Sequence, residues 1–251
     1  MLRRPDAASM SSLATVAALA LAACAPTQSS PADEPTTGAI SMHVAHRDDR
    51  FGVPTFIWLE PGVPPAAGTT AKAAAWQVLR QLASTYHLSS AALDATELRT
   101  LHDTGRGAVI AHFAQRVDDT EVFQLGVSIA LDRALQPVAA SGHLAPRVTQ
   151  SAAVALLDER TAIAAAQAAM SQRDTAPALR GLAAASIDKT RAHKTLYARP
   201  DGLTPGYYIE IDRQAPNSND SEMRAYVISA TDGGVLFEKD LTAADSYSYR
   251  V

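Results

Sequence analysis

The sequence predicts an α+β protein: two successive units, each a helix followed by an antiparallel sheet, after a disordered leader. Two observations support this fold class. Apolar residues recur at helical spacing once in each half of the chain, and strand-like segments separated by tight turns follow both times. A helix with one apolar stripe must bury that stripe, so we expect each helix to pack on the sheet that follows it. At 251 residues the chain can hold one large domain or two of about a hundred residues each.

The first unit opens with an extended segment and a helix. Prolines in Arg50–Pro65 forbid a helix interior, so this segment is predicted to be extended, with Phe56, Ile57 and Trp58 packed on another element. A helix is then predicted from about Ala71 to Tyr86, because Thr69 and Thr70 can cap its first turn. Its apolar stripe consists of Ala75, Leu79, Leu82, Ala83 and Tyr86.

The strands of the first unit are predicted from alternation and turns. We expect strands at Glu97–Leu101, Ala108–Arg116 and Val138–Gly142. The clearest signal is a stretch in which every second residue is apolar, which is typical of a half-buried antiparallel strand. Its apolar positions are Phe123, Leu125, Val127, Ile129 and Leu131.

The second unit repeats this plan after a junction near Pro146–Ser151. Helical spacing runs from Ser151 to Ala169, with a break near Asp158 where a new cap can begin. A polar loop is expected at Ala215–Glu222, and the glycines of Thr231–Gly234 favour a tight hairpin turn. The predicted strands are Thr195–Tyr197, Tyr207–Asp212, Ala225–Ala230 and Val235–Lys239.

The N-terminus has the features of an export signal. Arg3 and Arg4 precede the apolar run Leu13–Ala23, which is too short to span a bilayer. The run ends directly before Cys24 and resembles the lipobox of bacterial lipoproteins, which implies acylation of that cysteine and an outer-membrane location. An ordinary secretory signal, cut after Ala20, Ala22 or Ala23, is the alternative. We expect a signal peptide over residues 1–23 and a flexible tether over residues 24–41.

Composition excludes several classes of partner and site. The formal net charge is -4, without a basic stripe, so nucleic-acid binding is not expected. A single cysteine excludes an internal disulfide and any cysteine-rich metal site.

The histidines form no recognisable catalytic motif. None of the seven begins the H-E-x-x-H pattern of zinc peptidases. His43 and His46 have the right separation, but Val44 stands where the glutamate is needed, so we interpret both as surface residues. His102 and His112 lie on neighbouring predicted strands and could face one another. Without a third ligand they are interpreted as solvated sheet positions.

Other catalytic patterns are missing as well. The sequence contains no G-x-S-x-G elbow, and the G-x-G at Gly105–Gly107 lies in a predicted hairpin turn with no helix behind it. Adjacent acids are read as solvated turn or helix-start residues: Asp48-Asp49, Asp118-Asp119 and Asp158-Glu159. We therefore predict no catalytic, cofactor-binding or metal-binding residue, and Cys24 is the one predicted site.

A longer stretch resembles a known family. Ala73–Gly142 is similar to the fungalysin/thermolysin propeptide (FTP) domain, and the upstream RFGVPTFIW is similar to the segment that opens such propeptides. The downstream PGYYIEID and RAYVISATDGGVLFEKDLTAADSYSYRV resemble the PepSY-like second part. The similarity spans roughly residues 42–251, and Asp119 departs from it where the family often has glycine. The matching features are Leu88-Ser89, His102-Asp103, Arg116-Val117-Asp118 and Glu121-Val122-Phe123.

The resemblance implies an FTP domain over residues 42–146 and a PepSY-like domain over residues 147–251, both cystatin-like. It also implies a non-catalytic propeptide that inhibits a secreted zinc metalloprotease and helps it fold, in cis or in trans. Zinc would belong to that protease, whose catalytic domain does not precede Val251, so the chain is expected to be the N-terminal portion of a precursor.

Two alternatives stay open. The chain could be a stand-alone outer-membrane lipoprotein, anchored through Cys24, that binds or inhibits proteases. It could also be an enzyme in its own right, in which case changing His102 or His112 would abolish hydrolysis.

Overall fold

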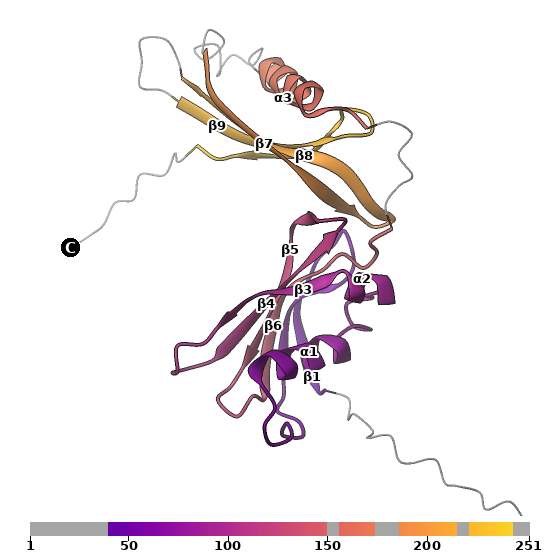
Figure 1. Ribbon diagram of the computed structural model, residues 1–251, viewed down its shortest axis with the longest axis vertical. Coiled ribbons are helices and arrows are strands. Elements are labelled where there is room, and N and C mark those ends of the chain that lie inside the picture. The colour runs from indigo at the N-terminus through magenta and orange to yellow at the C-terminus, as the bar shows by residue number, and fades with distance from the viewer. Residues whose placement is uncertain (1–39, 150–155, 174–185, 215–220, 243–251) are drawn as a thin grey trace, which may run out of the picture. The chain divides into compact units, whose positions relative to one another are not determined.

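Strands make up most of the described chain, and the helices among them are short (Figure 1). The computed structural model describes residues 40–149, 156–173, 186–214 and 221–242, which all lie in the unit Gly38–Val251. In chain order the elements are β1 (Met42–Arg47), β2 (Pro54–Leu59), α1 (Ala71–Gln81), α2 (Ser90–Asp94), β3 (Thr96–His102), β4 (Val109–Val117), β5 (Thr120–Leu131), β6 (Pro137–His143), α3 (Glu159–Arg173), β7 (Ser186–Arg199), β8 (Gly202–Gln214), β9 (Ser221–Ser229) and β10 (Val235–Asp240).

The predicted fold class, two helix-plus-sheet units of the cystatin type, is wrong. The ten strands of the described residues join into one sheet in the order β1-β2-β6-β5-β7-β8-β9-β10, with β4 beside β5 and β3 beside β4. The helices have only 11, 5 and 15 residues, so the protein is mostly β. The apolar pattern underestimates the strands: β7 has 14 residues, whereas the pattern predicts only Thr195–Tyr197, because charged residues interrupt its alternation.

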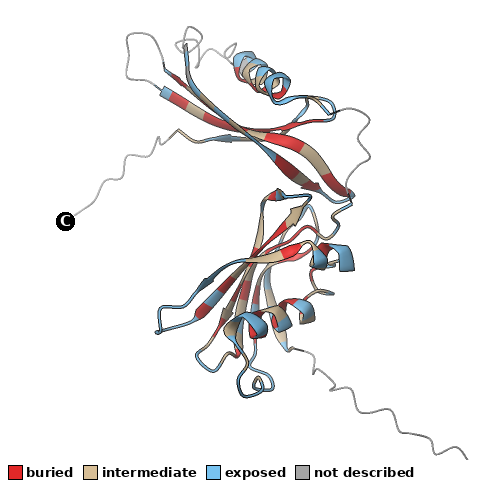
Figure 2. Ribbon diagram, viewed as in Figure 1, coloured by how far each residue is buried: buried red, intermediate tan, exposed pale blue. Residues whose placement is uncertain are grey.

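The strands β1 to β6, here called the first sheet, are ordered β1-β2-β6-β5-β4-β3, and all neighbours are antiparallel. α1 covers one face of this sheet (Figure 1). Buried residues lie along the strands beneath the helix, and the outer side of the helix is exposed (Figure 2). The main strand side chains of this core are Ile57, Leu59, Val109, Ala111, Phe113, Val127, Ile129, Leu131 and Ala140.

α1 begins where the sequence predicts and ends earlier. The Thr70 hydroxyl accepts a hydrogen bond from the amide of Ala73 at 3.2 Å, as an N-cap does. The helix ends at Gln81, and a series of turns carries the chain onward to Tyr86. Leu82 and Tyr86 are nevertheless buried, so the predicted apolar stripe continues beyond the end of the helix. Burial of a leucine side chain contributes about 2 kcal/mol.

β5 follows the predicted alternation over only part of its length. Val127, Ile129 and Leu131 are fully buried under α1, as expected. Gln124 has a φ of 53°, in the left-handed region, and this breaks the alternation. Val122 is therefore buried in place of Phe123.

The strands β7 to β10, here called the second sheet, are also antiparallel between neighbours. α3 packs on one face of this sheet and buries Ala162, Ala166 and Met170. The Asp158 carboxylate accepts the amide hydrogen of Thr161 at 2.8 Å, so α3 starts at the predicted break. Residues 151–155 of the predicted helix and residues 215–220 of the predicted loop lie outside the described residues.

The two sheets are joined along β5 and β7. Val122 and Leu196 form a parallel bridge, and the Thr195 hydroxyl donates to the carbonyl of Glu121 at 3.2 Å. A small core of Val122, Ala145, Leu196, Ala198 and Leu203 surrounds this contact. Within the described ranges, none of the helices has the length and apolar character needed to cross a bilayer.

Candidate functional site

The histidines singled out in the sequence lie on the first sheet. His43 and His46 are exposed on the edge strand β1, where they pair with Trp58 and Phe56 of β2. This is a strand, so the helical geometry of a zinc-peptidase motif is not available to them. Cys24, the predicted lipid-attachment residue, lies outside the described residues.

His102 and His112 share a face of the sheet without pairing directly. His102 is the register partner of Ile110, and His112 is the register partner of Thr100. His112 is half-buried, and its Nδ1 lies 3.0 Å from the hydroxyl oxygen of Ser128 on β5. No group of three His, Cys, Asp or Glu side chains that could hold a metal ion occurs within the described ranges.

These histidines belong to the face of the first sheet that α1 leaves uncovered, here called the open face. Side chains alternate between the two faces of a strand, and register partners share a face, so the face can be read across all six strands. The first row across it is His43, Trp58, Ala139, Ala130, Ile110 and His102. The second row is His46, Phe56, Ser141, Ser128, His112 and Thr100.

The centre of the open face carries only small side chains. Four residues on the neighbouring strands β5 and β6 form this strip, here called the lane: Ser128, Ala130, Ala139 and Ser141. Larger side chains border the lane on both sides: Phe56 and Trp58 on β2, and Ile110 and His112 on β4. The Phe56 and Trp58 rings lie 4.9 Å apart, edge to face.

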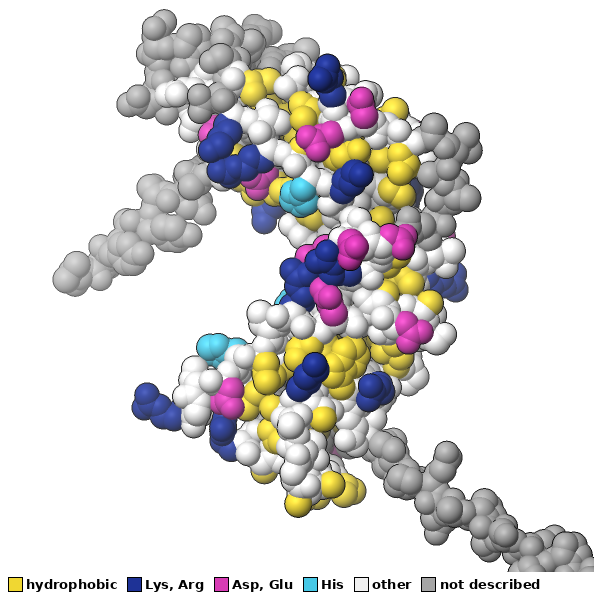
Figure 3. Space-filling model, viewed as in Figure 1, with side chains coloured by type: hydrophobic (Ala, Val, Ile, Leu, Met, Phe, Trp, Pro, Cys, Tyr) yellow, Lys and Arg dark blue, Asp and Glu magenta, His cyan; other side chains and the backbone are white. Residues whose placement is uncertain are grey.

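Two large apolar side chains of this face are exposed to solvent. Trp58 is 52% exposed and Ile110 is 40% exposed. A partner that covers this face would bury both side chains, and buried aromatic side chains are the usual anchors of protein interfaces. In Figure 3, which shows the face that carries α1, hydrophobic side chains surround the helix and separate basic side chains lie among them.

The imidazole of His112, on the border of the lane, lies where Gly126 leaves space. A Cβ atom built on Gly126 would lie 2.7 Å from Cε1 of His112, so no side chain fits there. The imidazole therefore occupies the space that a side chain at position 126 would fill. This contact and the Ser128 hydroxyl fix the ring beside the lane.

The rows of the open face hold four imidazoles and no carboxylate among their described positions. Acids at the margins are paired with arginines instead. Asp103 lies 2.6 Å from Arg133, whose hydrogen bond lowers the pKa of the Asp103 carboxyl. Glu97 and Glu121 both pair with Arg99, at 3.0 and 3.1 Å.

The helix-free face of the second sheet is already occupied by an aromatic cluster. Phe123 of β5 contacts Tyr208 and Phe237 at ring distances of 5.3 and 5.0 Å, and it stacks on Tyr197. The Arg50 guanidinium donates to the Tyr197 hydroxyl at 2.8 Å. Burial, together with a hydrogen bond to Glu210, raises the pKa of Tyr208 to about 12, so the phenol stays neutral.

Two other polar features have structural explanations. Glu222 is buried and accepts hydrogen bonds from Arg213 and Arg224 on the second sheet. Breaking such a buried pair destabilises a fold, because the remaining charge loses its partner.

A pocket of about 410 Å³ beside the start of α3 has Asp118, Asp158 and Lys194 as its charged lining residues. Asp158 accepts the amide hydrogen of Thr161 and so caps α3.

Sequence reasoning located the histidines and missed the site that they border. The predicted segment Phe56–Trp58 divides between two faces, with Ile57 in the core and both aromatic neighbours on the open face. Alternation within β2 could have shown this division. The lane could not be found that way, because it depends on the register between β5 and β6.

Comparisons with known proteins give little support to any family. No protein-family model matches the sequence. No curated protein matches it. Among solved structures the chain is similar to the Bacillus megaterium YpeB C-terminal domain, with 8% sequence identity and a TM-score of 0.29 over 82% of this chain and 92% of that chain. A TM-score of this size is too low to show a shared fold, so the match assigns neither a family nor a function.

Proposed function

We propose that the chain is a non-catalytic docking module that binds a secreted zinc metalloprotease of the fungalysin type, inhibits it and assists its folding. Residues 42–146 and 147–251 would be its FTP and PepSY-like parts. The resemblance of Ala73–Gly142 to such propeptides supports the choice of partner. The zinc would belong to the protease.

The observation that carries this proposal is the open face. Its small-residue lane lies between exposed anchors, Trp58 on one side and Ile110 on the other. A partner that covers this face would remove both apolar side chains from water, and buried aromatic anchors supply much of the affinity in protein interfaces. If the module and the protease belong to one polypeptide, a modest intrinsic affinity suffices, because the link gives each a high effective concentration near the other.

The test uses the full chain and a purified mature metalloprotease of the thermolysin/fungalysin class. We expect the chain to slow hydrolysis of a fluorogenic peptide and to accelerate recovery of activity after the protease is denatured. Trp58→Ala should raise the inhibition constant about tenfold or more, as the loss of an interface anchor does. Val63→Ala is the matched control, since Val63 is 88% exposed in a loop outside the rows of the open face.

Two results would contradict the proposal. One is the absence of both inhibition and assisted refolding. The other is equal loss of inhibition in the Trp58 and Val63 variants, since this would place the contact elsewhere.

The sequence before Cys24 favours a second candidate, a stand-alone outer-membrane lipoprotein that restrains proteases in trans. We expect mass spectrometry of the membrane fraction to find a diacylglyceryl group on Cys24. Cys24→Ser should release the protein from the membrane while leaving inhibition unchanged. Unmodified Cys24 in the wild-type protein would exclude this candidate.

A further inference from the structure

One edge of β7 is uncovered along much of the strand. Toward β8, the residues of β7 pair in an unbroken register from Lys189 to Arg199. Toward β5, pairing is limited to the bridge between Leu196 and Val122. The stretch Lys189–Lys194, here called the β7 edge, therefore has no strand on its other side in the described part of the chain. Every second residue of a strand directs its amide and carbonyl to the same side, so the β7 edge presents unpaired backbone donors and acceptors.

The other open edges of the two sheets are less suited to receive a strand. β1, β3 and β10 have six, seven and six residues, and each pairs with its described neighbour through a register shift. Short and irregular edges are a common means of avoiding unwanted strand pairing. The β7 edge contains no such shift, so an extended peptide can form a regular ladder along it.

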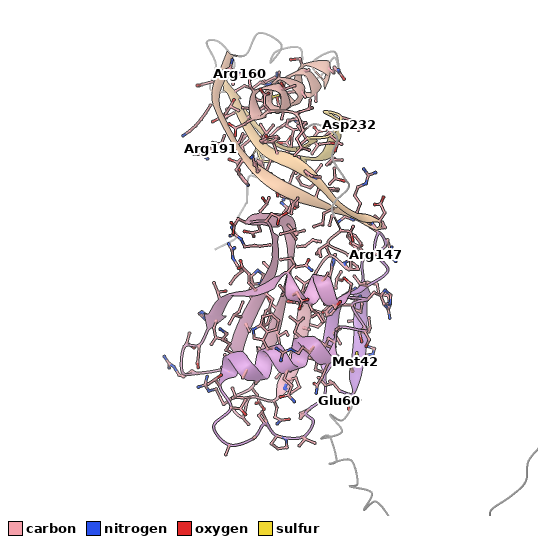
Figure 4. The ribbon with its side chains drawn as sticks, turned by 45° about the vertical axis from the view of Figure 1, so that its right-hand side comes forward. Met42, Glu60, Arg147, Arg160, Arg191 and Asp232 are labelled. Atoms are coloured by element: carbon pink, nitrogen blue, oxygen red, sulfur yellow. The ribbon has the colours of Figure 1, made fainter. Side chains whose placement is uncertain are left out.

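The β7 edge carries two lysines without an ion-pair partner among the described residues. Lys189 and Lys194 are both exposed. Arg191, labelled in Figure 4, lies between them, is 60% exposed and pairs with Glu210 of β8 at 3.4 Å. Lysines on an edge strand discourage indiscriminate pairing, so they select for a peptide that brings carboxylates.

The neighbouring acidic residues leave this preference in place. Asp212 of β8 is the register partner of Lys189, but it lies on the side of β7 that is already paired. β7 itself contains Asp188, whose side chain lies outside the described residues. An added strand would approach from the opposite side of β7, about 4.8 Å from its backbone, where cross-strand pairs of opposite charge are favourable.

The β7 edge ends at the pocket beside the start of α3. Lys194 is one of the residues that line this pocket of about 410 Å³. The Leu157 amide donates to the Ala230 carbonyl at 2.7 Å, and the Leu157 carbonyl accepts from the Tyr207 hydroxyl at 3.3 Å, so this wall is fixed. The volume is sufficient for a leucine or phenylalanine side chain. Further apolar walls come from Val117, Leu156, Leu196 and Pro205.

A strand added at the β7 edge would direct a side chain toward this pocket. Register partners share a face of a sheet. Lys194 and its partner Tyr207 on β8 both line the pocket, so the pocket lies on their common face. The residue of an added strand opposite Lys194 would share that face, whereas the residue opposite Lys189 would point to the other face. The edge and the pocket therefore form one site.

We propose that the β7 edge and its pocket bind an extended peptide segment as an additional strand, with one large apolar side chain in the pocket and a carboxylate beside Lys189. Strand addition obtains affinity from backbone hydrogen bonds and specificity from pockets for alternate side chains. This inference goes beyond the proposed function, because the site lies on the second sheet and does not include the open face.

The direct test measures binding of strand-forming peptides to the full chain. The probe is an acetylated and amidated peptide of about nine residues, with a leucine near each end on one face and glutamates on the other. Two further peptides carry N-methyl groups at alternate residues, one at odd and one at even positions, so each lacks the amide donors of one edge only. Fluorescence anisotropy should show a loss of about tenfold or more in affinity for one methylated peptide and less than about threefold for the other. Equal effects of the two methylation patterns would overturn strand addition.

Variants of the pocket assign the binding to this site. Leu156 is 54% exposed, so Leu156→Asp removes no core side chain, and it should weaken peptide binding about tenfold by placing a charge at the apolar pocket. Leu101→Asp is the matched control, since Leu101 is a leucine that is 41% exposed on β3 of the first sheet. It should leave the affinity unchanged.

A charge reversal tests the acidic preference. Lys189→Glu should weaken binding of the glutamate peptide about threefold or more and strengthen binding of a peptide with lysine at those positions. Lys72→Glu, at an exposed position of α1 on the first sheet, is the control and should change neither affinity. Unchanged affinities in the Lys189 variant would refute the carboxylate preference.

Failure of this inference can be told apart from failure of the proposed function. Trp58→Ala, which should weaken inhibition, should leave peptide binding unchanged, because Trp58 lies on the open face. If the chain binds none of the strand peptides, or if the Leu156 and Leu101 variants behave alike, the strand-addition site is refuted whatever the inhibition assay shows.

Discussion

At the scale of single residues, Tyr86 places a polar group in the core at a cost. Its side chain is 1% exposed, and its hydroxyl has no hydrogen-bond partner among the described residues. Burial raises the pKa of Tyr86, so the phenol stays protonated throughout the physiological range. A buried hydroxyl without a partner costs about 1–3 kcal/mol relative to water.

Tyr86→Phe removes this hydroxyl and keeps the ring. We expect the free energy of unfolding to rise by about 1 kcal/mol, measured by urea denaturation. A fall of similar size would mean that the hydroxyl has a partner and stabilises the core.

Gly126 determines the position of a binding-site side chain. Gly126→Ala introduces a methyl group 2.7 Å from Cε1 of His112, so the imidazole must shift from its present position beside Ser128. We expect this to weaken inhibition of the metalloprotease several-fold, with a loss of about 1 kcal/mol in stability. The ring resonances of His112 in NMR spectra should shift. Gly62→Ala is the control, because no atom lies within 4 Å of the added Cβ. It should change neither the stability nor the His112 resonances.

At the scale of elements, local signals predicted where α1 and α3 begin and the hairpin turn after β9, whereas α1 ends earlier than predicted. Thr70 and Asp158 cap α1 and α3 as expected, and Gly233 has a φ of 75° in the predicted hairpin turn. These features depend on residues a few positions apart, so a single sequence contains them. The bulge at Gln124 and the length of β7 depend on distant strands, and the alternation in the sequence does not show them.

The cap of α3 makes a contribution that depends on pH. Hydrogen bonds from the side chain and backbone of Thr161 lower the pKa of Asp158. A carboxyl whose folded pKa is lowered stabilises the fold above its unfolded value, near 3.9, and this contribution is lost as the pH falls through the folded pKa. We expect Asp158→Ala to lower Tm by a few degrees at pH 7.

The difference in Tm between this variant and the wild type should shrink as the pH is lowered toward 3. Circular dichroism melts at several pH values give the comparison. A difference that stays constant down to pH 3 would show that the ionised carboxylate does not contribute through the cap.

At the scale of the whole molecule, the two sheets differ in how their helix-free faces are used. On the second sheet that face is taken by the cluster around Phe123, which also joins β5 to β7, β8 and β10. On the first sheet the corresponding face presents the lane with Trp58 and Ile110 exposed. The sequence did not predict this asymmetry, because it arises from register and from the β5–β7 contact. Because Trp58 and Ile110 stay exposed on the first sheet, that sheet is the better docking surface.

The central claim is that the partner covers the open face, and the two tryptophans of the chain report on it directly. Trp58 lies on the open face, whereas Trp76 of α1 packs edge to face on Phe113, with ring centres 4.8 Å apart, on the opposite side of the sheet. The measurement is ¹⁹F NMR of the chain labelled with 5-fluorotryptophan. The metalloprotease is added at concentrations at which the chain inhibits it. We predict that the Trp58 resonance shifts or broadens while that of Trp76 stays in place. An unchanged Trp58 resonance under conditions of full inhibition would contradict the claim.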